Sequence, residues 1–94
     1  MSLSWPTVPS DPTGSLAGAD LHGVRLVRAD LAGVDLTRAC LDGANLRKAL
    51  LGGVRAAHAS FIGARMGRAD LGRALLRGAD LSSADLSGST LRDA

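Results

Sequence analysis

The chain has 94 residues, a formal net charge of +2 from eleven basic and nine acidic residues, and one cysteine, Cys40. This length suits one domain, and the near balance of charge argues against a nucleic-acid partner. A single cysteine excludes an intramolecular disulfide framework and fits a reducing compartment, so we expect a cytoplasmic protein. No stretch approaches roughly 18 continuous apolar residues, so we expect no membrane-spanning helix and no membrane partner.

Residues 1–13 differ in composition from the rest of the chain. They hold all three prolines and the only tryptophan, Trp5. The prolines exclude a helix and disfavour a regular strand, and the absence of a basic start and an apolar run argues against a signal peptide. Two interpretations stay open: Trp5 and Val8 form a lid over Leu16 and Leu21, or the segment is a disordered leader.

A five-residue unit repeats sixteen times over residues 14–93 without insertion, as in Ala79-Asp80-Leu81-Ser82-Ser83. The third position is Leu in thirteen units, the first is Ala or Val in fourteen, and the fifth is Gly in eight. A step of five rotates a helical side chain by about 140°, and on a strand it alternates faces, so both elements would expose many Leu side chains. A chain that turns a corner once per unit instead directs the first and third positions inward. Glycine at the fifth position fits a corner with positive φ.

The repeated Ala-Asp-Leu-x-x pattern resembles the pentapeptide repeat proteins. The resemblance covers residues 14–93 and implies an all-β solenoid, a right-handed quadrilateral parallel β-helix. Four corners close one coil in about twenty residues, and stacked coils would lie roughly 4.8 Å apart. We therefore expect residues 1–13 to be a leader or cap and residues 14–94 to be a β-helix of four coils, at 14–33, 34–53, 54–73 and 74–93.

The third coil has the unusual central residues Ala56, Phe61 and Met66. Phe61 is larger than Leu and Ala56 is smaller. We expect the ring of Phe61 to fill the volume that Ala56 leaves, which keeps the total core volume nearly constant. A functional pocket at Ala56 is the alternative.

The fourth coil has no helix or polar cap after it in this sequence. Solenoid ends normally need a cap, because the outer coil leaves backbone groups and core side chains open. We therefore expect a weak homodimer through the end formed by Leu76, Leu81, Leu86 and Leu91. The alternative is that the Ser residues at this end make it polar enough without a partner.

Residues twenty apart are expected to stack on one side of the solenoid. The side centred on Leu26, Leu46, Met66 and Leu86 then carries six of the eleven basic residues and a single acid. The six basic residues of this side are Arg25, Arg28, Arg47, Lys48, Arg65 and Arg68. They predict a docking surface for an acidic protein partner; a solvated charged face is the alternative. No aromatic residue for base stacking lies there, which argues against single-stranded nucleic acid.

A second side stacks Asp20 and His22 over Cys40 and Asp42. These residue types are zinc ligands, and a carboxylate with a His could activate a Cys nucleophile. The group is flat and exposed, and it has no metal-site spacing. We therefore expect a surface contact between His22 and Asp20, with no metal, cofactor or catalytic residue.

A chain of this kind could have one of three functions. The first is a non-catalytic protein-binding or scaffolding module. The second follows from the resemblance: some pentapeptide repeat proteins resemble duplex DNA, bind DNA gyrase and confer resistance to its inhibitors. This chain departs from them through its net charge of +2 and its basic side. The third is an enzyme, but no nucleophile elbow, phosphate-binding loop or metal spacing is present. We expect the first.

Overall fold

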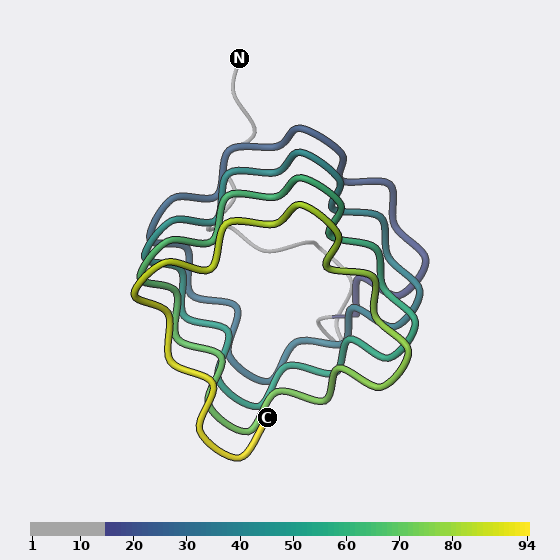
Figure 1. The fold of residues 1–94 in the computed structure, drawn as a ribbon. Coiled ribbons are helices and arrows are strands. Elements are labelled where there is room, and N and C mark those ends of the chain that lie inside the picture. The colour runs from purple at the N-terminus through teal and green to yellow at the C-terminus, as the bar shows by residue number, and fades with distance from the viewer. Residues whose placement is uncertain (1–14) are drawn as a thin grey trace.

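The computed structural model describes residues 15–94, so the predicted leader and its lid of Trp5 and Val8 lie outside the described residues. Figure 1 shows the chain winding into a four-sided tube whose successive coils stack on one another. Within residues 15–94 the backbone forms only single-residue β-bridges and turns, with no helix. No helix long and apolar enough to cross a membrane is found in that range.

The coils are joined by parallel β-bridges between residues twenty apart, one set on each side of the tube. Every bridged residue occupies the second position of its unit. The four sets are Ser15–Asp35–Arg55–Leu75, Asp20–Cys40–Ser60–Asp80, Arg25–Asn45–Arg65–Asp85 and Asp30–Leu50–Asp70–Thr90. The stacking period of twenty that the spacing predicts is therefore present on all four sides.

Each unit ends in a tight turn that makes the corner. The carbonyl of Leu41, for example, accepts a hydrogen bond of 3.0 Å from the N–H of Ala44, three residues on. The fifth position has positive φ throughout, as the third residue of a type II turn requires. Eight of these residues are Gly; the others are Arg28, Arg38, Lys48, His58, Arg68, Arg73, Ser83 and Asp93. The predicted corner geometry is confirmed.

Backbone hydrogen bonds connect each coil to both of its neighbours. N–H groups at the third and fifth positions donate to the following coil, and N–H groups at the second position donate to the preceding coil. In residues 69–73 these bonds are Leu71 to Thr90 (2.7 Å), Arg73 to Arg92 (2.8 Å) and Asp70 to Ala49 (3.0 Å). Because each of these bonds reaches a neighbouring coil, the stacking of coils provides the hydrogen-bond partners of the backbone N–H and C=O groups.

In the described residues, the fourth-position N–H donates no hydrogen bond to a backbone carbonyl. A side-chain oxygen at the second position of the same unit often accepts its hydrogen bond instead. Asp70 Oδ1 accepts from the N–H of Gly72 at 2.9 Å, and Asp85 Oδ1 accepts from the N–H of Ser87 at 2.9 Å. Asp20, Asp30, Asp35, Asn45 and Asp80 make the same bond. This local side-chain-to-backbone turn explains why the second position is so often Asp, a role that the spacing alone did not predict.

The core is a column of third-position side chains lined by small first-position residues. Leu31, Leu51 and Leu71 on one side are fully buried. Ala56 and Phe61 are fully buried too and belong to the same cluster, so both stay in the core as expected. Close packing of such columns excludes water from the interior of the tube and leaves the outer faces for function.

Candidate functional site

The structure places all six predicted docking residues on one side, exposed to solvent. The bridges Arg25–Asn45–Arg65–Asp85 run up this side. Arg28 N–H donates to the carbonyl of Arg47 at 2.9 Å, which sets these two cations in adjacent coils. We call the surface formed by Arg25, Arg28, Arg47, Lys48, Arg65 and Arg68 the basic side.

Three residues of the basic side occupy corners that favour glycine. Arg28, Lys48 and Arg68 have φ values of 62°, 61° and 58°. For a residue with a side chain, this left-handed conformation costs roughly 1–2 kcal/mol. The five other non-glycine corners have the same conformation, so it is a property of the turn and does not distinguish the basic side. Glycine would stabilise each of these three corners more.

The cations of the basic side have no acidic partner at short range. Among residues 15–94, the structure contains no ion pair between an Arg or Lys and a carboxylate. Asp85, the single acid on this side, accepts hydrogen bonds from the Oγ and N–H of Ser87 at 2.5 Å and 2.9 Å. The bond from the Ser87 hydroxyl is the main cause that lowers the pKa of Asp85, and the charges of Arg47 and Arg65 add to it. The positive charge of this side is therefore available to a ligand.

A hollow of about 240 Å³ lies on the basic side between neighbouring coils. Its lining residues are Arg47, Lys48, Gly67, Arg68 and Ser87. The hollow exists because Gly67 has no side chain, whereas Arg47 and Ser87 occupy the same position in the coils before and after it. We call this hollow the Gly67 notch. The sequence signal that could have revealed the notch is a glycine at the fourth position, because within residues 15–94 only the fifth position has the positive φ that favours glycine.

A larger hollow, of about 420 Å³, lies on another side. Its lining residues are Gly52, Asp70, Gly72, Arg73, Thr90, Arg92 and Asp93. Two acidic and two basic residues balance each other there, so its charge does not favour one kind of ligand. The smaller Gly67 notch differs, because its three charged residues are all basic and favour an anion.

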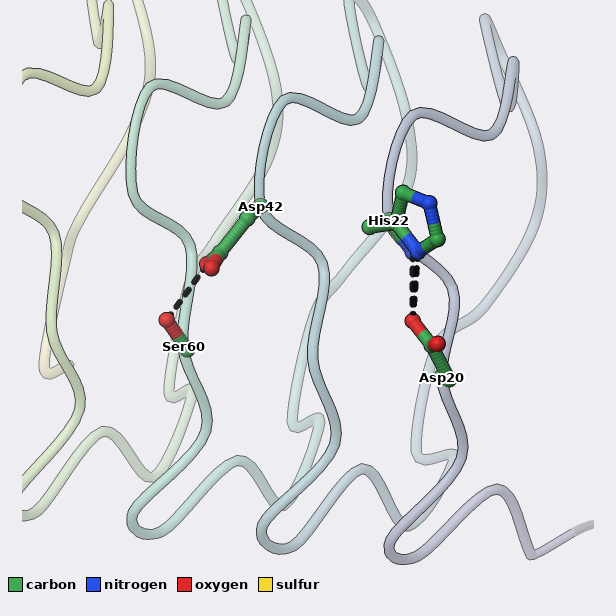
Figure 2. Close-up of polar contacts among 4 residues, drawn as sticks. All are labelled: Asp20, His22, Asp42 and Ser60. Carbon is green, nitrogen blue, oxygen red and sulfur yellow. Dashed lines mark hydrogen bonds and ion pairs between the residues drawn. The ribbon is translucent and has the colours of Figure 1, made fainter.

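The predicted group of Asp20, His22, Cys40 and Asp42 is brought together only in part. His22 Nδ1 lies 2.7 Å from Asp20 Oδ1, which confirms the expected surface contact. Figure 2 shows that Asp42 points away from His22, toward Ser60 of the next coil. Asp42 Oδ1 accepts from the Ser60 hydroxyl and, at 3.0 Å, from the N–H of Ile62. Among the described residues, no three His, Cys, Asp or Glu side chains are placed to hold a metal ion.

The contact between His22 and Asp20 changes the pKa of both groups. Their side-chain hydrogen bond is the main cause that raises the pKa of His22 above 6.5 and lowers the pKa of Asp20 below 3.8. The bond from Ser60 is the main cause that lowers the pKa of Asp42. The side chains of His22 and Asp20 are 71 % and 70 % exposed, so this pair lacks the water-excluding pocket of a catalytic site.

The predicted dimer end is less buried than the rest of the core. Leu76, Leu81 and Leu86 are half-buried, and Leu91 is 43 % exposed. Dimerisation through these residues stays a prediction, which sedimentation of the chain would test.

The chain matches the family described as pentapeptide repeats in eight copies, over residues 15–53 and 57–93. A pentapeptide repeat protein from Nostoc PCC 7120, alr5209, is 38 % identical with a TM-score of 0.75, over 77 % of this chain and 60 % of that one. Rfr23 from Cyanothece 51142 is 30 % identical with a TM-score of 0.62, over 81 % and 48 % of the two chains.

A third solved relative is a pentapeptide repeat protein of the Arabidopsis thaliana thylakoid lumen. It is 28 % identical with a TM-score of 0.63, over 80 % of this chain and 59 % of that one. The chain therefore spans about half to three fifths of the length of these relatives. Comparison with curated protein sequences gives no significant match.

Proposed function

Because the chain belongs to the pentapeptide repeat family, we propose that it is a right-handed quadrilateral β-helix of four coils that acts as a non-catalytic protein-binding module. Its basic side docks an acidic surface of a protein partner. The filled core leaves function to the outer faces, and Cys40 as the single cysteine supports a reducing, cytoplasmic location.

The observation that carries this proposal is the unpaired positive charge of the basic side. Six cations are exposed on one side, and among residues 15–94 none of them is ion-paired with a carboxylate. Exposed like charges repel one another, so this arrangement does not stabilise the fold. It attracts a negatively charged partner and orients it, which is the usual effect of charge complementarity at interfaces.

The alternative of a gyrase-binding mimic of DNA receives less support. Such mimicry needs a negative surface, whereas the net charge is +2 and the most directional charge feature is positive. Within residues 15–94, one side does carry Asp20, Asp42 and Asp80 without an Arg or Lys, but these three carboxylates are fewer than the six cations of the basic side.

The test compares three baits in affinity capture from the source cell, read by quantitative mass spectrometry. They are the wild type, Arg47→Glu with Arg65→Glu, and Arg77→Glu with Arg92→Glu. The two variants change the net charge equally, but Arg77 and Arg92 lie on other sides. We expect the wild type and the second variant to retain the same proteins, and the first variant to lose them.

Binding should also weaken as salt rises, because exposed charges are screened within about 8–10 Å at physiological ionic strength. Proteins that stay bound to all three baits at high salt would show that the basic side is not the docking surface.

A further inference from the structure

Over the described part of the chain, the fourth-position N–H is the backbone donor that neither the ladder between coils nor the corner turn uses. Where the second position is Asp, a carboxylate oxygen of the same unit accepts this bond, as in Asp70 with Gly72 at 2.9 Å. At Ile62 a carboxylate from the preceding coil does so: Asp42 Oδ1 accepts from the Ile62 N–H at 3.0 Å. The fold therefore contains a recurrent site for one carboxylate oxygen on its outer surface.

Gly67 has this donor without an acceptor. The second position of its unit is Arg65, whose guanidinium can only donate hydrogen bonds. Within residues 15–94, no group accepts a hydrogen bond from the Gly67 N–H. Because the equivalent N–H of Ile62 reaches a carboxylate on the previous coil, the Gly67 N–H is accessible to an oxygen that lies between Gly67 and Arg47.

The surroundings of this donor favour an anion. Gly67 lines the notch whose charged residues are Arg47, Lys48 and Arg68. The backbone N–H of Lys48 donates to the carbonyl of Gly67 at 2.9 Å, which places Lys48 directly beside the glycine. A free N–H and three cations around one hollow provide the donors that a carboxylate needs for charge-assisted hydrogen bonds.

We propose that the Gly67 notch binds one side-chain carboxylate, from Asp or Glu, of an acidic peptide segment. One oxygen of the carboxylate accepts from the Gly67 N–H, as Asp oxygens do elsewhere in this fold, and the other faces Arg47, Lys48 and Arg68. This inference rests on the proposed docking function and assigns the group that enters the basic side.

A matched pair of variants isolates the notch from the rest of the basic side. Gly67 and Gly52 both occupy fourth positions, and neither has positive φ. An added Cβ would lie 3.6 Å from the Ser87 carbonyl oxygen in one case and 3.7 Å from that of Gly72 in the other, both ordinary contacts. Thr37 already occupies a fourth position, so Gly67→Thr and Gly52→Thr should both fold.

The probe is a capped tetra-aspartate peptide, with capped tetra-asparagine as its uncharged control. Amide spectra of the 15N-labelled chain are recorded as the peptide is added. We expect the Gly67 amide to shift with tetra-aspartate and not with tetra-asparagine, while the Gly52 amide stays in place. Gly67→Thr keeps the backbone N–H but fills the notch in front of it, so the carboxylate can no longer reach that donor. Binding should then weaken by about fivefold or more, the loss of one charge-assisted hydrogen bond, and Gly52→Thr should bind as the wild type does.

Other outcomes separate this inference from the proposed function. If tetra-aspartate shifts the amides around Arg28 and Lys48 but not that of Gly67, and Gly67→Thr binds normally, the basic side docks acids and the notch assignment is wrong. The notch assignment is also wrong if tetra-aspartate does not bind while the affinity capture of proteins from the source cell still depends on Arg47 and Arg65. A tighter response to a phosphoserine peptide of equal charge would overturn the assignment to a carboxylate.

Discussion

At the scale of single residues, the corner position shows how backbone conformation and side-chain function compete. Every fifth-position residue from Gly18 to Asp93 has positive φ, but only half of them are glycine. The side chains that remain are mostly basic, and three of them belong to the basic side. The turn therefore tolerates a side chain at its corner, at a cost in stability.

The corner geometry predicts unequal effects of two alanine substitutions. Gly43 has a φ of 70°, and nothing lies within 4 Å of the place that an added Cβ would take. Arg38 adopts a φ of 60° with a side chain already present. Gly43→Ala should lower the free energy of unfolding by about 1 kcal/mol, because alanine strains the left-handed conformation. Arg38→Ala should change it by less than about 0.5 kcal/mol. Denaturant unfolding measures both, and equal losses would contradict the role given to the corner.

The contact between Asp20 and His22 predicts a pH dependence. Since the pKa of Asp20 is lowered below 3.8 and that of His22 is raised above 6.5, the contact stabilises the fold fully between these two pH values. The contribution is lost as pH falls through the lowered pKa of Asp20, and as pH rises through the raised pKa of His22.

An NMR titration of the imidazole protons checks this dependence. Asp20→Asn should bring the pKa of His22 down toward 6.5, while the resonances of His58, on another side, should not respond to the substitution. A His22 titration that is the same in both proteins would show that the contact is absent in solution.

At the scale of the repeating unit, the position of a residue in the unit decides its structural role. The first and third positions fill the core, the fifth makes the corner, and the second supplies the oxygen that the fourth-position N–H needs. Asp35 and Thr37 show the last pairing with bonds of 3.0 Å and 2.6 Å from the N–H and hydroxyl of Thr37. The hydroxyl bond is the main cause that lowers the pKa of Asp35.

The unusual third-position residues predict coupling between two units. Ala56→Leu alone should overpack the core and lower the free energy of unfolding by roughly 1–3 kcal/mol, and Phe61→Leu alone should leave a void. The double variant restores the regular pattern and should be at least as stable as the worse single variant. Thermal melts of the four proteins measure the coupling, and strictly additive effects would mean that the two side chains do not share a volume.

At the scale of the whole molecule, the spacing of the sequence predicts the architecture well. Inward Leu side chains, a corner in every unit and pairing of residues twenty apart all follow from an unbroken period of five. The same period places the six cations on one side, since Arg25, Arg65 and their neighbours differ by fixed multiples of the repeat.

The details of the candidate site could be predicted from the period only in part. The turn of Asp42 toward Ser60 depends on the side-chain rotamer, because its carboxylate could instead have faced His22. The Gly67 notch could have been found from the sequence, because the period of twenty places a residue without a side chain between Arg47 and Ser87. The direction of the Asp42 side chain arises from contacts between coils and not from the repeat itself.

The direction of the backbone bonds also gives the tube an electrical polarity. In each unit, two peptide groups point their N–H toward the following coil and one points toward the preceding coil. One peptide dipole of about 3.5 D per unit is therefore left uncompensated along the axis. Its positive end faces the later coils, opposite to the polarity of an α-helix, so the electrostatic potential along the axis becomes more positive toward the later coils.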